Sequence, residues 1–375
     1  MSRRLPLEGV RVVELCWVWS GPMMGQHLAD LGAEVVKVEW YDRFDLYRTR
    51  GVERLRGKLP ERVRRESSYS FQSLNRNKLG FATNLKTEQG LGLLKQLIGE
   101  ADVLLENFTV GTLDRLGLAP DTLRELNPKL VLISLAATGR GSAVEALRGY
   151  GLMRSALGGY EERVTDRQGQ FMGSPTFVMS DPNAALFGIF ASLAGVLHAR
   201  RIGRGANFEC SQVEAVASLM DAPPPPDAEQ RGPQGVVQSA DGRHLAVTLP
   251  PGNAELPGDV AELETWSRQH GAAQIEAQVK AAGGFVCEVR DLGVTDVCPE
   301  FAGREVRQPV LHPVAGQRQL VATPWHLDGR RSDVRKPAPL LGESNEYVLR
   351  KVLGLSEEQI QQVHDSGVVD EGGVR

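Results

Sequence analysis

The carboxylate best placed to do chemistry is Asp181, in the segment FVMSDPNAALFG. An Asp-Pro pair before a long apolar run is typical of a helix start, with Asp181 as the N-cap and Pro182 at the first helical position. A helix N-terminus favours the ionised form of a carboxylate, and an anionic carboxylate is what covalent catalysis needs. The spacing therefore allows two roles for Asp181, helix cap and nucleophile, and does not decide between them.

Four basic residues lie at or near the ends of predicted elements in the first half of the chain: Lys78, Lys86, Arg115 and Arg148. In an open parallel α/β sheet, ligands bind outside the carboxyl ends of the strands. Cations at such positions can pair with phosphates. Solubilising surface charge is the alternative for each of them taken alone.

The first strand-to-helix turn, SGPMMG, partly matches the dinucleotide-binding pattern GxGxxG. Gly21 and Gly25 are present and Glu39 ends the next strand, but Met23 stands where the middle glycine belongs. A closely packed turn is favoured over a nicotinamide dehydrogenase, because no catalytic His or Lys constellation accompanies the turn.

No metal site is expected from the histidines and cysteines. The seven histidines show no i, i+4 pair, and the four cysteines, which form no CxxC, are Cys16, Cys210, Cys287 and Cys298. We expect structural or surface histidines and reduced thiols, which is typical of a cytoplasmic protein.

The composition is that of an ordinary globular protein, with 41% hydrophobic and 24% charged residues. The net charge of −4 lacks the basic excess of a nucleic-acid-binding protein. We see no signal peptide and no apolar run of about 20 residues, so we expect no membrane span.

The elements that would position these residues alternate between strand and helix. Apolar strands are predicted at 10–16, 34–40, 80–85, 102–106, 130–135 and 207–210, and helices at 24–31, 87–99, 121–126 and 181–200. Residues 41–70 are polar and Arg-rich, which predicts a long surface excursion. This alternation indicates an α/β fold with a parallel sheet covered on both faces.

A domain boundary is predicted at the segment DAPPPPDAEQRGPQG, because four consecutive prolines form a stiff linker. The predicted division is a large α/β domain at 1–222, the linker at 223–235, a shortened small domain at 236–320 and a final part at 321–375. A hairpin turning at Asp241-Gly242, two helices and a strand are predicted for the small domain.

Many separate segments together give the chain a highly specific resemblance to a known family. In order they are LEGVRVVEL, SGP, HLADLGAEVVKVE, NRNK, NLKTEQG, EADVLLENF, LDRLGL, LRELNPKLVLISL, SDPNAALFGIFASLAGVLHARRIGRGANFECSQVEA and PAPLLGES. The chain resembles the family III CoA-transferases, a group that contains formyl-CoA transferase, carnitine CoA-transferase and α-methylacyl-CoA racemase. The resemblance is dense over Leu7–Met220 and returns over Arg335–Val369.

The resemblance implies a Rossmann-like parallel-sheet domain built from both chain ends, a small α+β middle domain and an interlocked homodimer. It implies transfer of coenzyme A from an acyl-CoA to a small organic or aromatic carboxylic acid, with no permanently bound cofactor. In this family an aspartate attacks the thioester to give a mixed anhydride and then an enzyme thioester. The motif SDPNAALFG assigns that role to Asp181.

The resemblance also implies a set of positions that contact coenzyme A. Lys86, Arg115 and Arg148 suit phosphate groups, and Trp19 and Trp40 suit stacking on adenine. The full set is Trp19, Ser20, Trp40, Thr83, Asn84, Leu85, Lys86, Asn107, Phe108, Thr109, Arg115, Arg148, Gly149, Tyr150 and Gly151.

Three departures from the family pattern and two alternative functions accompany this assignment. The residues after the second strand are commonly Arg-Pro or Pro-Pro in the family and are Trp40-Tyr41 here. The residue after Tyr150 is commonly acidic in the family and is Gly151 here, and the middle domain is short. A racemase would need a histidine beside the aspartate, but no histidine lies between His27 and His198, so a transferase is favoured over a racemase. A non-catalytic CoA-binding subunit of a hetero-oligomer is the other alternative, suggested by the short middle domain.

Overall fold

A computed structural model describes residues 4–166, 170–173, 178–220, 232–290 and 303–369. The chain divides into two compact units, Met1–Asp221 with Glu305–Arg375, and Ala222–Arg304. The return to the first unit at Glu305 precedes the hairpin of β10 (Arg307–His312) and β11 (Gly316–Val321). That hairpin therefore belongs to the first unit, whereas the sequence prediction placed it in the small domain. Most of the predicted linker lies outside the described residues.

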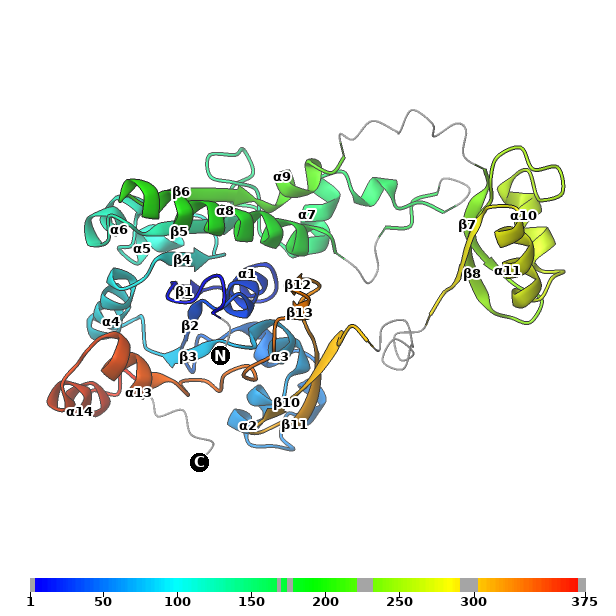
Figure 1. Cartoon of the computed structure of the whole chain (residues 1–375). Helices are drawn as coiled ribbons and strands as arrows, with labels where there is room; N and C mark the ends of the chain where they lie inside the picture. Colours follow the sequence, from blue (N-terminus) through cyan, green and yellow to red (C-terminus); the bar gives the residue numbers. More distant parts are fainter. Residues whose placement is uncertain (1–3, 167–169, 174–177, 221–231, 291–302, 370–375) are drawn as a thin grey trace. The chain divides into compact units, whose positions relative to one another are not determined.

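The first unit is built on a six-stranded sheet with the order β3-β2-β1-β4-β5-β6 (Figure 1). Every pairing in it is parallel, for example Val13 with Val36 on one side and Val13 with Leu104 on the other. The strands are β1 (Arg11–Leu15), β2 (Glu34–Glu39), β3 (Leu79–Ala82), β4 (Val103–Glu106), β5 (Val131–Ala136) and β6 (Asn207–Ser211). This sheet confirms the predicted α/β class with a large parallel sheet. Continuous apolar strands need cover on both faces, and a parallel sheet between helices provides it.

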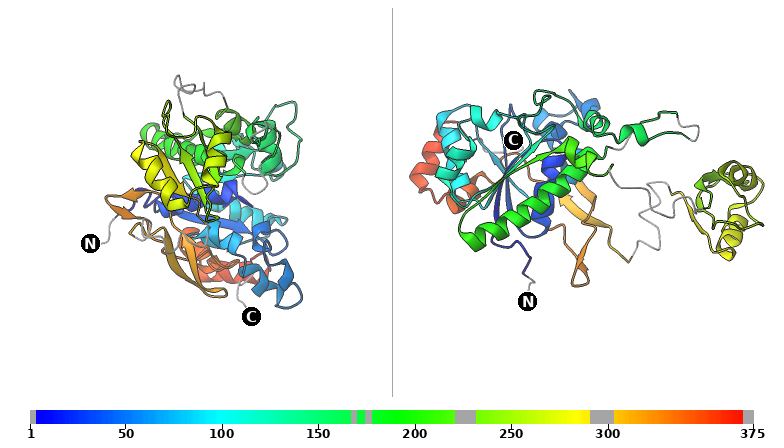
Figure 2. Two further views of the ribbon diagram at one scale, coloured as in Figure 1. Left: turned by 90° about the vertical axis from the view of Figure 1, so that its right-hand side faces the viewer. Right: turned by 90° about the horizontal axis from the view of Figure 1, so that it is seen from above.

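Helices cover both faces of this sheet (Figure 2). One face packs against α1 (Ser20–Asp30), α8 (Ser180–Ile202) and α9 (Gln212–Ala217). The other packs against α4 (Glu88–Gly99), α6 (Pro120–Leu126) and the C-terminal segment, which comprises α13 (Asn345–Tyr347), the π-helical turn η5 (Val348–Val352) and α14 (Glu357–Asp365). The C-terminal residues therefore complete the core that the N-terminal strands begin.

Residues 41–70 are not the plain surface excursion that their polarity predicts. They contain two 3-10 turns, η1 (Leu46–Arg48) and η2 (Glu53–Leu55), the helix α2 (Glu61–Glu66) and the start of α3 (Tyr69–Asn75). Arg48 is fully buried and donates to Glu39 at 2.8 Å and to Glu66 at 2.6 Å. Paired charges allow this polar segment to pack against the domain, which sequence polarity alone does not reveal.

Helix α8 begins one residue earlier than predicted, at Ser180. Met179 occupies the N-cap position without a side-chain hydrogen bond, so the prediction that Asp181 is the N-cap is wrong. Gly188 and Gly195 let the helix approach Met24 of α1 and Val131 of β5, where a Cβ would overlap those side chains. The absence of a β-carbon at these two positions allows α8 to lie close to α1 and to β5.

On length and composition alone α8 could cross a membrane, although it contains no uninterrupted apolar run of about 20 residues. One side of α8 packs against α1, α9 and β5 and buries Ala184, Ala185 and Val196. We interpret α8 as a core helix of the first unit.

The second unit has a three-stranded antiparallel sheet of β7 (Gln234–Gln238), β8 (His244–Thr248) and β9 (Phe285–Glu288). The helices α10 (Val260–Ser267) and α11 (Ala272–Ala281) pack on it around Leu263 and Ile275. The predicted hairpin turns at Asp241-Gly242, where Gly242 has a φ of +80°.

Candidate active site

The predicted site segments follow the carboxyl ends of the central strands. Trp17–Ser20 comes after β1, Trp40 after β2, residues 83–86 after β3 and residues 107–109 after β4. The loop that follows β5 reaches residues 148–151, where α7 (Gly151–Leu157) begins. Because the sheet is parallel, these segments start from one edge of it, the edge at which α/β proteins bind ligands.

A cleft of about 740 Å³ opens at this edge. Its lining includes these predicted residues: Trp19, Ser20, Asn107, Phe108, Thr109, Gly149, Tyr150, Gly151 and Asp181. Arg148 lines an adjoining cavity of about 280 Å³ that shares Phe108 and Tyr150 with the cleft. The structure therefore places Asp181 in one cleft with most of the positions assigned to coenzyme A.

Six predicted positions line neither of these two cavities: Trp40, Thr83, Asn84, Leu85, Lys86 and Arg115. Trp40 is half-buried with its ring edge-on to Tyr41. Lys86 is exposed in the turn after β3, and the guanidinium of Arg115 donates to Thr112 at 2.8 Å. Thr83 is fully buried.

Asp181 is nearly enclosed, with 8% of the residue exposed. The hydroxyl and backbone N–H of Ser20 favour its anionic form, and Nη1 of Arg154 lies 3.9 Å from Oδ1. Burial raises the pKa of Asp181 above its ordinary value of 3.8, while Arg154 and Ser20 act in the opposite direction. The site thus holds a poorly solvated carboxylate whose anionic form is supported by one cation and two donors.

A chain of hydrogen bonds fixes the direction of these donors. Arg154 can only donate, so its Nη1, 2.6 Å from Oε1 of Gln212, requires the oxygen of that amide to face it. The amide nitrogen of Gln212 must then donate to Oγ of Ser20, at 3.2 Å. The hydroxyl proton of Ser20 is therefore free to point at Asp181. Nη2 of Arg154 donates to the carbonyl of Gly149 at 2.8 Å, which anchors the guanidinium from its other side.

Gly151 is required at its position by the close approach of Asp181. A Cβ on residue 151 would overlap Oδ2 of Asp181 and Cγ1 of Val178. The acidic residue that is common at this position in the resembled family therefore has no room beside this arrangement of Asp181. The charge nearest to Asp181 is instead the positive charge of Arg154.

The turn that presents Ser20 is strained and is held by two side chains. Val18 has a φ of +74°, a conformation that is unfavourable for a β-branched residue. Oδ1 of Asp45 accepts from the N–H of Val18 at 2.9 Å. The side-chain amide of Asn107 accepts from the N–H of Trp17 at 2.9 Å and donates to its carbonyl at 2.8 Å. Asn107 therefore shapes the cleft by fixing this turn, because its amide is committed to the backbone.

Beneath the turn lies a buried cluster of charges. Lys37 is 3.0 Å from Glu14 and 3.1 Å from Asp45, and Lys78 is 2.7 Å from Glu14. All four of these side chains are fully buried. The interpretation of Lys78 as a phosphate-binding cation is wrong, because its ammonium group is enclosed by Glu14, Asn75 and the carbonyl of Pro22.

A family model described as CoA-transferase family III matches residues 7–253, about two thirds of the chain. The chain belongs to CoA-transferase family III. A succinyl-CoA–D-citramalate CoA-transferase of Chloroflexus aurantiacus is 27% identical, with 97% of this chain and 98% of that protein aligned. A succinyl-CoA:glutarate CoA-transferase of Mus musculus is also 27% identical, over 98% of this chain and 91% of that protein.

Solved structures agree with the family. The crystal structure of a hypothetical protein (Rv3272) of Mycobacterium tuberculosis aligns with a TM-score of 0.74 and 26% identity, covering 92% of this chain and 98% of that one. A CAIB/BAIF family protein of Brucella suis aligns with a TM-score of 0.76 at 23% identity, over 93% of this chain and 100% of that chain, and supports the fold alone.

Sequence reasoning about this family III chain missed Arg154, Gln212, Tyr47 and Arg50, of which Arg154, Tyr47 and Arg50 line the cleft and Gln212 lies behind Ser20. Arg154 lies three residues after Gly151 in α7, a spacing that puts both on one side of a helix, but nothing in the sequence indicates that this side faces α8. Gln212 directly follows Ser211, which caps α9 by accepting from the N–H of Glu214. A serine at an N-cap marks the start of a helix and gives no indication of the site.

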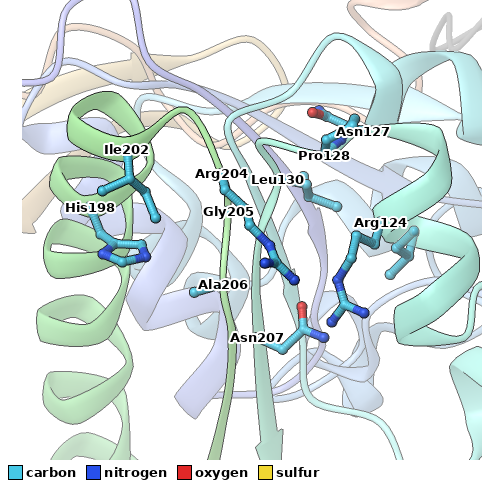
Figure 3. A pocket seen from close by; sticks show the side chains of 11 residues that line it. Arg124, Asn127, Pro128, Leu130, His198, Ile202, Arg204, Gly205, Ala206 and Asn207 are labelled. Atoms are coloured by element: carbon cyan, nitrogen blue, oxygen red, sulfur yellow. The ribbon is translucent and has the colours of Figure 1, made fainter.

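A further cavity, of about 240 Å³, lies at the opposite edge of the sheet and contains none of the predicted site residues (Figure 3). It is lined by Arg124 of α6, His198 of α8 and the segment Arg204–Asn207 that leads into β6. Arg124 is exposed and donates to Asp121 at 2.9 Å.

Proposed function

We propose that this family III protein transfers coenzyme A from an acyl-CoA to a free carboxylic acid, with Asp181 as the covalent nucleophile. The observation that carries the proposal is the position of Asp181. A buried carboxylate, freed from any capping role, faces a large cleft and is aligned by Ser20 and Arg154. Covalent catalysis needs an anionic carboxylate, and a nearby cation and hydrogen-bond donors favour that form.

The proposed first half-reaction begins with attack of the Asp181 carboxylate on the thioester carbonyl. The C–S bond breaks, CoA leaves as a thiolate and a mixed anhydride remains. The thiolate then attacks the aspartyl carbonyl, the bond between the aspartyl carbonyl carbon and the bridging oxygen breaks, and the acyl group leaves with that oxygen as a free carboxylate. No proton is required, since one anion is consumed and one is released at each step.

In the second half-reaction the acceptor carboxylate attacks the aspartyl thioester and expels the thiolate. The thiolate attacks the acyl carbonyl of the new anhydride, which releases the new acyl-CoA and regenerates the Asp181 carboxylate. Coenzyme A is then a substrate, and no permanently bound cofactor takes part. From the family resemblance we propose Lys86, Arg115 and Arg148 as partners of its phosphates and Trp19 and Trp40 as partners of its adenine. Of these, Trp19 lines the cleft and Arg148 lines the adjoining cavity.

Small organic acids are the proposed acceptors. The two relatives described above are named for succinyl-CoA with D-citramalate or glutarate. A relative in Bradyrhizobium, 26% identical over 97% of both chains, is named formyl-CoA:oxalate CoA-transferase. No histidine is among the described residues that line the cleft, which supports a transferase over a racemase.

We also propose that two copies of the chain associate. Helix α8 exposes large apolar side chains on the side away from the sheet, including Leu186 at 54% and Phe190 at 71%. An exposed apolar patch of this kind is typical of an interface. One relative, of Chloroflexus aurantiacus, is named as the beta subunit of a succinyl-CoA–L-malate CoA-transferase, so a related second chain is the alternative partner.

The proposed function is tested by exchange assays with the purified protein. Succinyl-CoA and other acyl-CoA donors are combined with a panel of small acids, and new acyl-CoA is followed by mass. We expect exchange with wild type and none with Asp181→Asn, because an amide cannot form the anhydride. Exchange by Asp181→Asn at the wild-type rate would contradict the proposal, and exchange that appears only after a related chain is added would support the hetero-oligomer.

A further inference from the structure

The guanidinium of Arg154 is held beside Asp181 with spare donor capacity. Its two terminal nitrogens donate to Gln212 and to the carbonyl of Gly149, and Nε is buried and has no hydrogen-bond partner among the described residues. Arginine carries several N–H groups in a fixed fork that matches a carboxylate. The two hydrogen bonds fix the plane of the guanidinium and leave other N–H groups free.

The charge of the site changes during the proposed reaction. Asp181 is an anion in the resting enzyme, but it is neutral as an anhydride or as a thioester. At the thioester stage the free acid, leaving or entering, is an anion in the same cleft. A half-buried cation such as Arg154 carries an unpaired charge once its carboxylate partner is neutralised, and another anion can then pair with it.

From this geometry we propose that Arg154 binds the carboxylate of the free acid substrate while Asp181 is present as its CoA thioester. This inference rests on the proposed function. Arg154 thus alternates between two carboxylates, that of Asp181 in the resting enzyme and that of the leaving or entering acid at the thioester stage. Its ligand is a small carboxylic acid, recognised by the one carboxylate that reacts.

The other arginine that lines the cleft is committed elsewhere. Nη1 of Arg50 donates to the hydroxyl of Tyr47 at 2.7 Å, and its guanidinium stacks 4.8 Å from the centre of the Tyr47 ring. An ion pair between Asp181 and a cation is recorded only for Arg154 among the described residues. Arg154 is therefore the cation positioned to receive a carboxylate that reacts at Asp181.

The test uses Asp181→Asn as a neutral mimic of the enzyme whose Asp181 is a CoA thioester. Succinate binding is measured by calorimetry on wild type, on Asp181→Asn, and on Asp181→Asn combined with Arg154→Gln. We expect Asp181→Asn to bind succinate about tenfold more tightly than wild type, and the double variant to lose that gain. Arg124→Gln in the Asp181→Asn background removes an exposed cation at the opposite edge of the sheet and should keep the gain.

Equal succinate affinity of Asp181→Asn with and without Arg154 would overturn the inference, as would the absence of any gain over wild type. Thermal melts establish that each variant folds, and Arg154→Lys, which keeps the charge, should retain part of the gain if Arg154→Gln proves unstable. A failure here is distinct from a failure of the proposed function. Wild type that exchanges CoA without this pattern of succinate binding refutes only the role of Arg154, whereas the pattern without exchange refutes only the transferase.

Discussion

At the scale of single residues, the site holds Asp181 in surroundings that disfavour its negative charge. Burial raises the pKa of this carboxyl, and Arg154 and Ser20 offset only part of the effect. The folded state therefore binds a proton more tightly than the unfolded state does, so stability decreases as pH rises from 3.8 through the folded pKa. Above that pKa the full cost of ionised Asp181 is present.

Asp181→Asn is expected to increase the free energy of unfolding at pH 7, because the burial that disfavours the Asp181 charge outweighs the support from Arg154 and Ser20. The measurement is urea denaturation of wild type and variant at pH 7 and again at pH 4. The gain should shrink at pH 4, where the wild-type carboxyl is more protonated. A variant that is less stable than wild type at pH 7 would show that the carboxylate is structural.

Gly151→Ala is expected to abolish most activity while the protein still folds. The new β-carbon would overlap Oδ2 of Asp181, so the carboxylate would turn away from Ser20 and the cleft. The exchange rate and the melting temperature should be compared with those of Gly92→Ala, since a β-carbon at residue 92 meets nothing within 4 Å. Wild-type exchange by Gly151→Ala would mean that the orientation of Asp181 described here is not the reactive one.

At the scale of elements, the turn after β1 depends on buried charges contributed by other segments. Asp45 holds the strained backbone at Val18 and is itself paired with Lys37, which also binds Glu14. Burial disfavours the ammonium form of Lys37, but Glu14, Asp45 and Glu39 raise its pKa, so Lys37 stays charged in the folded protein. The shape of the cleft is therefore determined one layer below its surface.

Lys37→Ala is expected to destabilise the protein by about 3–5 kcal/mol, because it leaves Glu14 and Asp45 as buried carboxylates with less compensation. Denaturant titration measures the loss. Lys86→Ala, which removes an exposed lysine from the turn after β3, is the control and should stay within about 0.5 kcal/mol of wild type. Equal stabilities for the two variants would refute the structural role of the cluster.

The sheet was predictable from the sequence and the buried charges were not. Apolar runs such as residues 130–135 allow few environments other than a covered parallel strand. In contrast, Lys78 and Glu14 are 64 residues apart in the chain, and no local pattern marks them as partners. The same is true of Arg154, whose role depends on α7 and α8 meeting.

At the scale of the whole molecule, the two sides of α8 have different surroundings. One side packs on α1 and β5, and the other exposes a row of apolar side chains that includes Phe187 and Leu197. The proposed dimer would cover the exposed side. The second unit, Ala222–Arg304, has a core of its own.

Light scattering is expected to give twice the chain mass of 40.9 kDa at micromolar concentration. Phe190→Glu, which places a charge on the exposed side of α8, should reduce the measured mass toward that of one chain. A wild-type mass of one chain at all concentrations would contradict the dimer.

The most direct test of the account is to identify the residue that becomes covalently modified. The protein is incubated with succinyl-CoA, treated with hydroxylamine or borohydride and digested, and the peptides are analysed by mass. We expect the hydroxamate or the reduced side chain on Asp181, only when succinyl-CoA is present, and no adduct in Asp181→Asn. An adduct on another residue, or exchange by wild type without any adduct on Asp181, would contradict the central claim that Asp181 is the nucleophile.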